Sequence, residues 1–436
     1  MPFRTLVPAN TGLFADAHAA SAPTRPLVST RMRIDRLGTS LAFLCGMLIL
    51  AGCGKGARSI SAVNGEPLSK VAPVAAQGAV SLATRNTTRL GGTDVATDAA
   101  AVARAVYPAL TPATRPAAVV LVNEHDWPAA LAASALAGAP LGAPLLFSRG
   151  NSLPDVSRET LEALAPLGAP ALGGVQVLRI GSAAPVPKGY LTRTLAPAQP
   201  ADIAVAIEQL LRHSGAPSPH QVIVLPATAN AALAMPAAGL AAESGAPILF
   251  VTQAGVPAAT AIALKRLKHP SIYVIDSPQI GDPTLAALRH LGPVTDITAG
   301  DEGTGAAANA IAIARFTDTQ FGWGVKEPGH GLVFANAARP LDAAAAAPLS
   351  ATGDYGPLLL LESATQIPAP LADYLGNIQP AYTPAFNFKP VRGVYNHGWL
   401  IGDEHAISAV TQAELDSLLE ISPRKQSSEP TVSQVE

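Results

Sequence analysis

Cysteine, aromatic residues and charge are all scarce in this chain of 436 residues. Charged residues make up 14% of it, against about 25% in an average soluble domain, and 29 Lys and Arg nearly balance 31 Asp and Glu. This argues against a tail-like polyampholyte and against a nucleic-acid-binding protein. The only two cysteines, Cys45 and Cys53, lie near the amino terminus, so the rest of the chain cannot hold a disulfide or a cysteine-based metal site.

Aliphatic and small residues are abundant in this chain, whereas aromatic and charged residues are scarce. Hydrophobic residues make up 49% of the chain although aromatic residues are only 5%, and there are 37 glycines and 40 prolines. This composition predicts a large aliphatic core with little aromatic content. At about 150 residues per domain, the length predicts two to three domains, each with enough apolar residues to bury a core.

A targeting segment is indicated around the cysteines. Basic Arg33 and Arg36 precede an apolar stretch from Leu41 to Leu50, and the small residues Ala51 and Gly52 follow before Cys53. This order predicts a signal peptide over residues 32–52, and its end resembles a bacterial lipobox, whose cysteine carries a lipid. The stretch is much shorter than the roughly 20 apolar residues that span a bilayer. We therefore expect lipidation at Cys53 and an extracytoplasmic protein of the cell envelope, anchored to the membrane.

The remaining terminal segments have little apolar periodicity. Residues 1–31 are expected to be disordered or to reflect a start codon placed too early, and residues 53–83 to form a flexible tether. Residues 411–436 are expected to form a helix and a disordered tail. Removal of residues 1–52 leaves 24 basic and 29 acidic side chains, a formal charge of −5.

Between these ends, three segments repeat one pattern of apolar and small residues. Each begins with an aliphatic run, continues through an Ala-rich stretch, and closes on Ala-Pro or Gly-Pro before a second aliphatic run. Short apolar runs bounded by Gly and Pro are typical of buried strands, and the longer Ala-rich stretch favours a helix. The pattern predicts strand, helix and strand in Val119–Ser148, Val222–Thr252 and Leu332–Ser363.

The flanks of these segments repeat as well. Pro154, Pro257 and Pro368 lie 103 and 111 residues apart, and each is placed to open a helix that leads to a third strand. A further helical pattern precedes each segment. A period this long predicts three tandem α/β domains of about 100 residues with mainly parallel sheets. The predicted repeats are residues 84–189, 190–292 and 293–410.

The repeats resemble the cell wall-binding repeat 2 family of bacterial surface proteins. That family opens with Arg-x-x-Gly-x-Asp, similar to Arg89–Asp94, and continues with a phrase of the type Asn-Phe-Pro-Asp-Ala-Leu-Ala-Ala, similar to Asp126–Ala133. The aspartate of this phrase is Ala129 in the first repeat and is kept as Asp342 in the third. The other matches are an Ala-Pro-Ile-Leu-Leu strand, at residues 143–146, 246–249 and 356–359, and a closing turn at Ile401–Ser408.

The resemblance implies three flavodoxin- or Rossmann-like repeats around a pseudo-threefold axis, and non-covalent retention on an anionic cell-wall polymer. Basic clusters or helix N-termini would face its phosphate or carboxylate groups. From the matched motifs, the candidate binding residues are Arg89, Asp94, Trp127 and Asp342. We expect no nucleic-acid partner.

Motifs for catalysis or metal binding are weak in this chain. His125 lies between Glu124 and Asp126 after a predicted strand and could act as a general base, but no Gly-x-Ser-x-Gly motif supplies a nucleophile. Two further polar groups, Asn396–His405 and Gly300–Gly305, fit loops and a helix entry better than a metal or phosphate site. We therefore predict a non-enzymatic protein without metal or cofactor. The alternative is a solute-binding lipoprotein or envelope hydrolase, with His125 and Asp126 lining its pocket.

Overall fold

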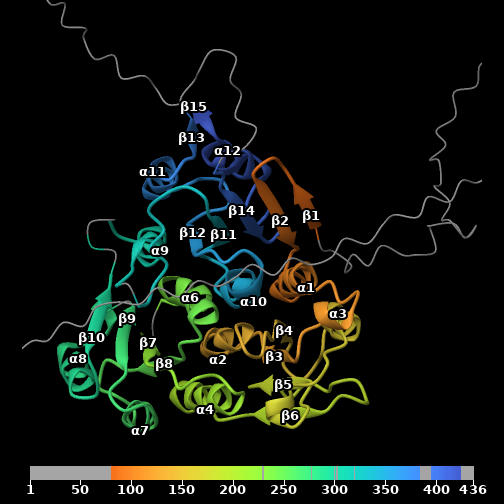
Figure 1. The fold of residues 1–436 in the computed structure, drawn as a ribbon, viewed down its shortest axis with the longest axis vertical. Coiled ribbons are helices and arrows are strands. Elements are labelled where there is room, and N and C mark those ends of the chain that lie inside the picture. Colours follow the sequence, from red (N-terminus) through yellow and green to blue (C-terminus); the bar gives the residue numbers. More distant parts are fainter. Residues whose placement is uncertain are drawn as a thin grey trace, which may run out of the picture. The chain divides into compact units, whose positions relative to one another are not determined.

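The structure is a computed structural model. It describes residues 80–227, 230–275, 277–298, 300, 303–318, 320–382 and 394–423, all within the compact unit Val71–Glu436. The predicted signal peptide, the lipidation site Cys53 and the predicted C-terminal tail from residue 424 lie outside the described residues. Within them, helices alternate with the strands of three larger sheets (Figure 1).

The first two sheets share one topology. Their strand orders are β4-β3-β5-β6 and β10-β9-β7-β8, and every neighbouring pair is parallel. Consecutive parallel strands need a crossover, and the Ala-rich stretches provide it as helices. The strands are β3 (Val119–Asn123), β4 (Leu145–Ser148), β5 (Val177–Ile180), β6 (Thr192–Leu195), β7 (Gln221–Pro226), β8 (Ile248–Val251), β9 (Ser271–Ile275) and β10 (Val294–Ile297).

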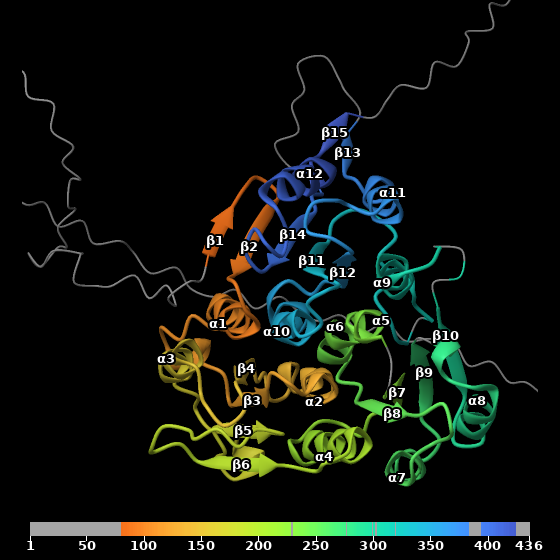
Figure 2. The ribbon, with the colours of Figure 1, turned by 180° about the vertical axis from the view of Figure 1, so that it is seen from behind.

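The third sheet joins the beginning of the described chain to its end. Its order is β1-β2-β14-β11-β12, parallel except for the antiparallel pair β1 and β2 (Figure 2). Because residues 80–83 form β1, the predicted tether is wrong for its last four residues. The strands are β1 (Val80–Ala83), β2 (Thr87–Gly91), β11 (Gly331–Asn336), β12 (Leu358–Leu361) and β14 (His397–Ile401), and β13 (Ala381–Tyr382) pairs separately with β15 (Ser422–Pro423).

Each larger sheet is completed by the strand that opens the next sequence repeat. β6 pairs with β5, β10 with β9, and β2 with β14, so the first repeat lends its opening strand to the third. The sheets are therefore offset by one strand from the predicted repeats at 84–189, 190–292 and 293–410. This exchange links the repeats in a closed cycle.

The helices begin where the sequence predicts. Pro154, Pro257 and Pro368 each form the N-cap of a helix, with φ near −55°. Proline suits the start of a helix because its fixed φ is compatible with that position and it has no N–H to satisfy. The helices are α1 (Val95–Val106), α2 (Trp127–Ala133), α3 (Asp155–Leu164), α4 (Pro200–His213), α5 (Ala231–Ala234), α6 (Pro236–Ser244), α7 (Ala258–Arg266), α8 (Asp282–Arg289), α9 (Ala306–Arg315), α10 (Asp342–Pro348), α11 (Ala369–Asn377) and α12 (Ala409–Leu419). Within the described ranges, no helix has the length and apolar character that crossing a membrane requires.

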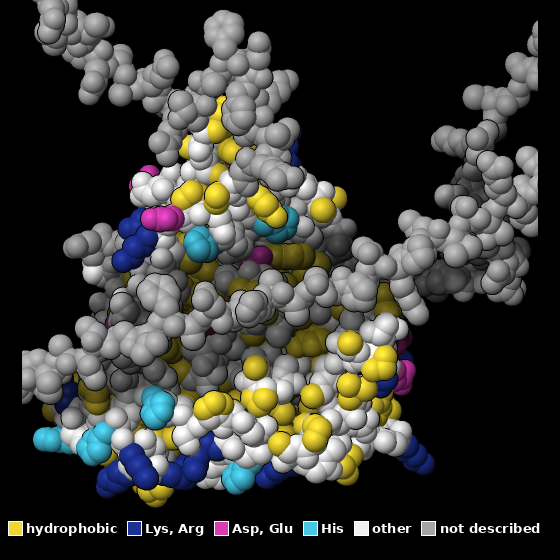
Figure 3. All heavy atoms as spheres, in the orientation of Figure 1, with side chains coloured by type: hydrophobic (Ala, Val, Ile, Leu, Met, Phe, Trp, Pro, Cys, Tyr) yellow, Lys and Arg dark blue, Asp and Glu magenta, His cyan; other side chains and the backbone are white. Residues whose placement is uncertain are grey.

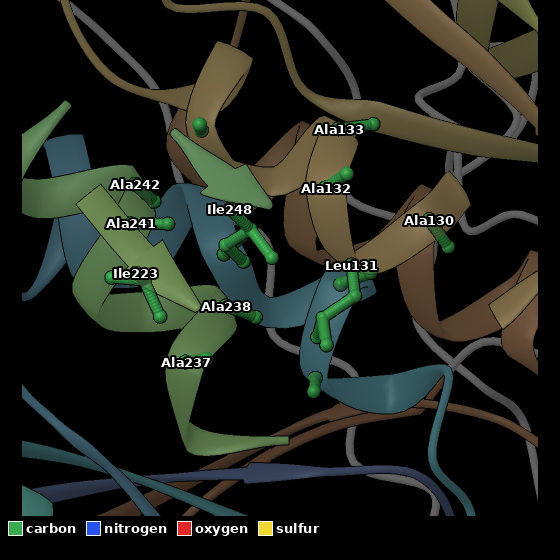
Figure 4. Close-up of a cluster of buried hydrophobic side chains, with 14 of the residues drawn as sticks. Ala130, Leu131, Ala132, Ala133, Ile223, Ala237, Ala238, Ala241, Ala242 and Ile248 are labelled. Carbon is green, nitrogen blue, oxygen red and sulfur yellow. The ribbon is translucent and has the colours of Figure 1, made fainter. Parts of the chain in front are cut away.

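Short Ala-rich helices bring the three repeats together. The 3₁₀ turn η3 (Ser134–Ala137) that continues α2 packs on α6 and α10, and α6 packs on α10, so each repeat contacts both others. Figure 4 shows alanines of α2 and α6 in one buried cluster, with Leu131 and Ile248 between them. A Cβ on Gly138 would lie 2.0 Å from the carbonyl oxygen of Ala242, so only glycine fits there. Small side chains thus permit the close helix approach, and the predicted fold of three α/β repeats in pseudo-threefold arrangement is confirmed.

Candidate functional site

Three cavities lie at the carboxyl ends of the parallel strands, one beside each sheet. In each sheet the chain leaves the central strand in one direction and returns past it, which opens a crevice at the strand ends where α/β proteins bind ligands. We call the cavities the Asp342 cleft, of about 200 Å³, and the Asp126 and Asn309 clefts, of about 480 Å³ each. Each lies between the loop after a central strand and the loop after the strand lent by the next repeat.

A buried ion-pair network underlies the Asp342 cleft. Arg339, in the loop after β11, donates from Nε to Asp342 Oδ2 at 2.7 Å and pairs through Nη2 with Asp98 of α1. Asp98 also accepts a hydrogen bond from the backbone N–H of Gly92 at 2.6 Å. Both carboxyl side chains are at most 1% exposed. The network therefore joins the first helix of repeat 1 to the second helix of repeat 3.

Two buried carboxyl groups beside one guanidinium cannot both ionise without cost. Burial and the nearby charge of Asp342 raise the pKa of Asp98 to about 9. Burial also raises the pKa of Asp342, to about 6, although Arg339 opposes this shift. Burial therefore favours retention of a proton within this pair of carboxyl groups.

Asp94, a candidate binding residue, caps α1 at the rim of this cleft. Its Oδ1 accepts from the Thr97 backbone N–H at 2.9 Å and from the Thr97 hydroxyl at 2.8 Å. Arg149 donates to Asp94 Oδ2 at 3.2 Å and to Glu124 Oε1 at 2.8 Å. Burial acts against ionisation, yet these hydrogen bonds hold the pKa of Asp94 below its usual value. Asp94 therefore has a structural role, as a helix cap, in this position.

The Asp126 cleft separates two residues that the alternative interpretation places together. Asp126 lines the cavity and caps α2 by accepting from the Ala129 N–H at 3.1 Å. His125 has a side chain 72% exposed, and its Nε2 lies 3.9 Å from Glu124 Oε1. Arg179 also lines the cavity and donates to Thr194 at 3.0 Å. The predicted pocket thus contains Asp126, whereas His125 lies on the exposed surface.

The Asn309 cleft includes the Gly300–Gly305 loop. Gly305, with φ of +102°, is the N-cap of α9, and the carboxylate of Glu362 accepts from the Ala307 N–H at 3.3 Å. Asn309 donates to the carbonyl of Leu233 at 2.6 Å and so links repeats 2 and 3. The protein's own glutamate occupies the helix start that a phosphate would need. The interpretation of this loop as a helix entry is confirmed.

Arg89 lies in strand β2, although the sequence suggested a turn before a helix. Its side chain is 1% exposed and donates to Gln412 Oε1 and to the carbonyl oxygens of Gly402, Asp403 and Ile407, at 2.6 to 3.0 Å. All of these acceptors belong to the third sheet or follow it. Arg89 therefore holds β2 in the third sheet. A polymer could contact its guanidinium directly only if these hydrogen bonds opened.

Trp127 lies between repeats 1 and 2. It is the first residue of α2, and its ring meets the ring of Phe250 in β8 edge-on, at 6.2 Å and 89°. An aromatic pair in this geometry stabilises a packed interface. A binding role for Trp127, as for Asp94 and Asp342, stays a prediction.

The polar residues at the end of β14 belong to a turn. Asp403 accepts from the backbone N–H of His405 and from its Nδ1, both at 3.0 Å, while the His405 side chain is 91% exposed. His397 shares a hydrogen bond of 3.0 Å with the Thr88 hydroxyl. In the described ranges, no three His, Cys, Asp or Glu side chains are grouped closely enough to hold a metal ion.

Each of the three clefts has a carboxyl group in its lining. Asp94 and Asp342 line one together with Arg339, Asp126 lines another together with Arg179, and Asp296 lines the third, where Glu362 covers the start of α9. Carboxylates repel phosphate and carboxylate groups, so the third cleft suits an anionic polymer poorly. Sequence reasoning missed Asp98 and Arg339. The sequence did contain one signal for Arg339: it lies three residues before Asp342, a spacing that allows the two side chains to form an ion pair at the start of a helix.

Comparison with known proteins adds a likeness of fold. No protein-family model and no curated protein matches the chain. Among solved structures it is similar to Cwp6 from Clostridium difficile, with a TM-score of 0.60 and 16% identity over 78% of this chain and 51% of that one. It is also similar to Cwp8 from Clostridium difficile, with a TM-score of 0.56 and 16% identity over 77% and 52%. The chain therefore spans about half the length of these two proteins and shares their fold over that part.

Proposed function

We propose that this chain is a non-catalytic protein of a bacterial cell envelope, anchored through a lipid on Cys53, whose three repeats bind an anionic cell-wall polymer. The observation that carries the proposal is the closed cycle of three α/β repeats, a fold shared with Cwp6 and Cwp8. The motifs that resemble the cell wall-binding repeat 2 family support it. The lipobox-like end of residues 32–52 supports the anchor.

Co-sedimentation with isolated wall sacculi tests the polymer binding. Residues 54–436 retain β1 and α12, which complete the third repeat, and carry no lipid. We expect them to sediment with intact sacculi, to be released as salt rises, and to stay in solution once the secondary anionic polymers have been stripped. Failure to sediment with intact sacculi at low salt would refute polymer binding.

The anchor needs a separate measurement in cells. Full-length protein should fractionate with membranes and incorporate a radiolabelled fatty acid, and Cys53→Ser should abolish the label. Cys45→Ser is the matched control, because it removes the other cysteine and leaves the lipobox-like residues intact. Equal labelling of the two variants would place the lipid elsewhere.

A further inference from the structure

Basic residues collect where three helices of repeat 2 end. Helix C-termini lie at the amino ends of the following parallel strands, so these residues belong to the edge of the sheet opposite the clefts. In α4, α7 and α8 the last turn is basic, and the connections to the next strands add more cations and imidazoles. The residues are Arg212, His213, His220, Lys265, Arg266, Lys268, His269, Arg289 and His290, and we call this surface the repeat-2 basic edge.

The topology of the second sheet places the three helices on one face. The chain moves from β7 to β8, then returns past β7 to β9 and on to β10. Because such crossovers are right-handed, α7 and α8 lie on one face of the sheet and α6 on the other. α4 packs against α7 and therefore shares its face. The acidic Glu243 ends α6, on the opposite face.

The connecting loops are in contact at this edge. The backbone N–H of Ser271 donates to the carbonyl of His220, and that of Ile272 to the carbonyl of Pro293, both at 2.8 Å. A Cβ on Gly292 would lie 2.2 Å from the carbonyl oxygen of Pro270. The loops that carry His220, Lys268 with His269, and His290 are thus adjacent, and the charges form one surface.

Little negative charge opposes these cations. Glu208 of α4 is fully buried and pairs with Arg266 and, at 3.8 Å, with Arg212. Lys265, Lys268 and Arg289 are exposed, as are all four histidines of the edge. Figure 3 shows Lys, Arg and His side chains along the lower margin, near α4, α7 and α8, without Asp or Glu among them in that view.

Helix C-termini favour cations in general, so a helix dipole alone could explain one basic residue at each. The other repeats follow that pattern only at α1 and α9. Arg104 at the end of α1 donates to Thr160, and Arg315 at the end of α9 lies over the ring of Tyr374. The last turns of α3, α11 and α12 contain no basic residue. On repeat 1, Arg158 is paired with acidic neighbours on α3. Among the described helices, those that end in an exposed cation are α4, α7 and α8, all of repeat 2.

The loop after α7 also holds a strained backbone. Lys268 and His269 both have φ of +60°, in the left-handed region that side chains other than Gly, Asn and Asp disfavour. Glycine would be the favourable residue for conformation alone, so the two polar side chains are present at a cost. Backbone strain is often found at functional sites, so the strained backbone at Lys268 and His269 favours a functional role for their two exposed side chains.

We propose that the repeat-2 basic edge is the surface that binds the anionic wall polymer, an inference that rests on the function proposed above. Repeated phosphate or carboxylate groups along one chain would contact several of these cations at once. Each exposed contact is weak in water, and many contacts made by one polymer add up. The clefts at the opposite edge would then remain free of polymer.

A triple variant tests the edge without disturbing the Glu208 pairs. Lys265→Gln, Lys268→Gln and Arg289→Gln together remove three exposed cations, and Lys188→Gln, Arg193→Gln and Lys326→Gln remove three exposed cations elsewhere. We expect the edge variant of residues 54–436 to bind sacculi at least tenfold more weakly than the parent, with a shallower salt dependence. The control variant should stay within twofold of the parent.

The outcomes separate the two proposals. If the parent does not bind sacculi, the proposed function fails. If the parent binds and the edge variant binds equally well, or the control loses as much, the function stands and the edge is excluded. Vesicles of phosphatidylglycerol and phosphatidylcholine form a further arm, and binding to them with none to sacculi would assign the edge to the membrane surface instead.

A second variant distinguishes lost contacts from lost folding. Lys268→Gly with His269→Gly removes two side chains from the edge and places glycine where the backbone favours it. We expect an unchanged or higher Tm together with binding to sacculi at least threefold weaker. Binding equal to the parent at an unchanged Tm would show that this loop does not contact the polymer.

Discussion

At one register position of the lent strand, the three sheets carry different residues. Arg89 of β2, Thr194 of β6 and Asp296 of β10 are equivalent by strand pairing. Arg89 is buried with four hydrogen bonds, whereas Thr194 and Asp296 are exposed. The junction that closes the cycle is therefore polar and buried, while the junction of repeats 1 and 2 packs Trp127 on Phe250.

The difference follows from chain connectivity. β6 continues directly from β5 through a short loop, so its pairing needs little loop closure, whereas Arg89 meets Gly402 across 313 residues. A longer loop costs more entropy to close, and any exposed strand edge could accept β2. The buried guanidinium of Arg89 finds its hydrogen-bond acceptors only when β2 pairs with β14, so it favours this pairing over others. Closure by sequence-distant strands thus coincides with a buried set of directional hydrogen bonds.

Removal of the Arg89 side chain should have the largest effect on this comparison. Arg89→Ala leaves three carbonyl oxygens and one amide buried without their donor, and we expect the free energy of unfolding to fall by about 3 kcal/mol or more. Urea denaturation followed by circular dichroism measures it. Thr194→Ala, at the equivalent exposed position, should change stability by about 0.5 kcal/mol or less. Equal losses in the two variants would show that the closing strand is not special.

Truncation at the apolar junction should cost less. Trp127→Ala removes a half-buried ring from Phe250, and we expect a loss of about 2 kcal/mol, below the range for fully buried aromatic residues. Trp127→Phe keeps an aromatic partner and should recover most of it. Denaturation of both variants measures the difference. A larger loss than for Arg89→Ala would reverse the order of the two junctions.

A pH dependence confined to the closing junction sharpens the comparison further. The pKa of Asp98 rises from 3.8 to about 9 on folding. The folded protein therefore binds more protons than the unfolded chain in that window, and this contribution to stability is lost as the pH rises toward 9. Asp98→Asn is neutral throughout and keeps an acceptor for the Gly92 N–H. Relative to the parent, the stability of this variant should therefore increase as the pH rises from 5 to 9.

Thermal melts across that range check the sign. Asp202→Asn is a suitable control, because Asp202 is exposed in the first turn of α4. Its difference from the parent should stay flat with pH. A difference for Asp98→Asn that does not grow with pH would mean that Asp98 ionises normally in the folded protein.

Much of the fold was predictable because local signals agreed. Pro154, Pro257 and Pro368 marked helix starts through fixed φ, and aliphatic runs such as 119–122 and 145–147 marked strands buried on both faces. The lent strands were missed. β6 and β10 carry Thr, Arg and Asp among few apolar residues, because edge strands are partly exposed and lack the buried pattern.

The candidate site was less predictable for a related reason. A motif gave Arg89 and Trp127 as candidate binding residues. The structure places Arg89 in a buried hydrogen-bond network and Trp127 against Phe250, and a binding role for either stays a prediction. The cations of the repeat-2 basic edge lie in four separate segments between residues 212 and 290, and no local pattern connects them. Only the parallel sheet brings the ends of α4, α7 and α8 to one edge.

By itself, the sequence determined three α/β repeats, their helix starts and an aliphatic, Ala-rich core, because periodicity, proline and side-chain volume act over a few residues. The tertiary structure decided which strand completes which sheet, and with it the partners of Arg89 and Asp98. Backbone hydrogen bonds are the same for every strand, so pairing across 313 residues depends on packing and buried charge that exist only after the repeats meet.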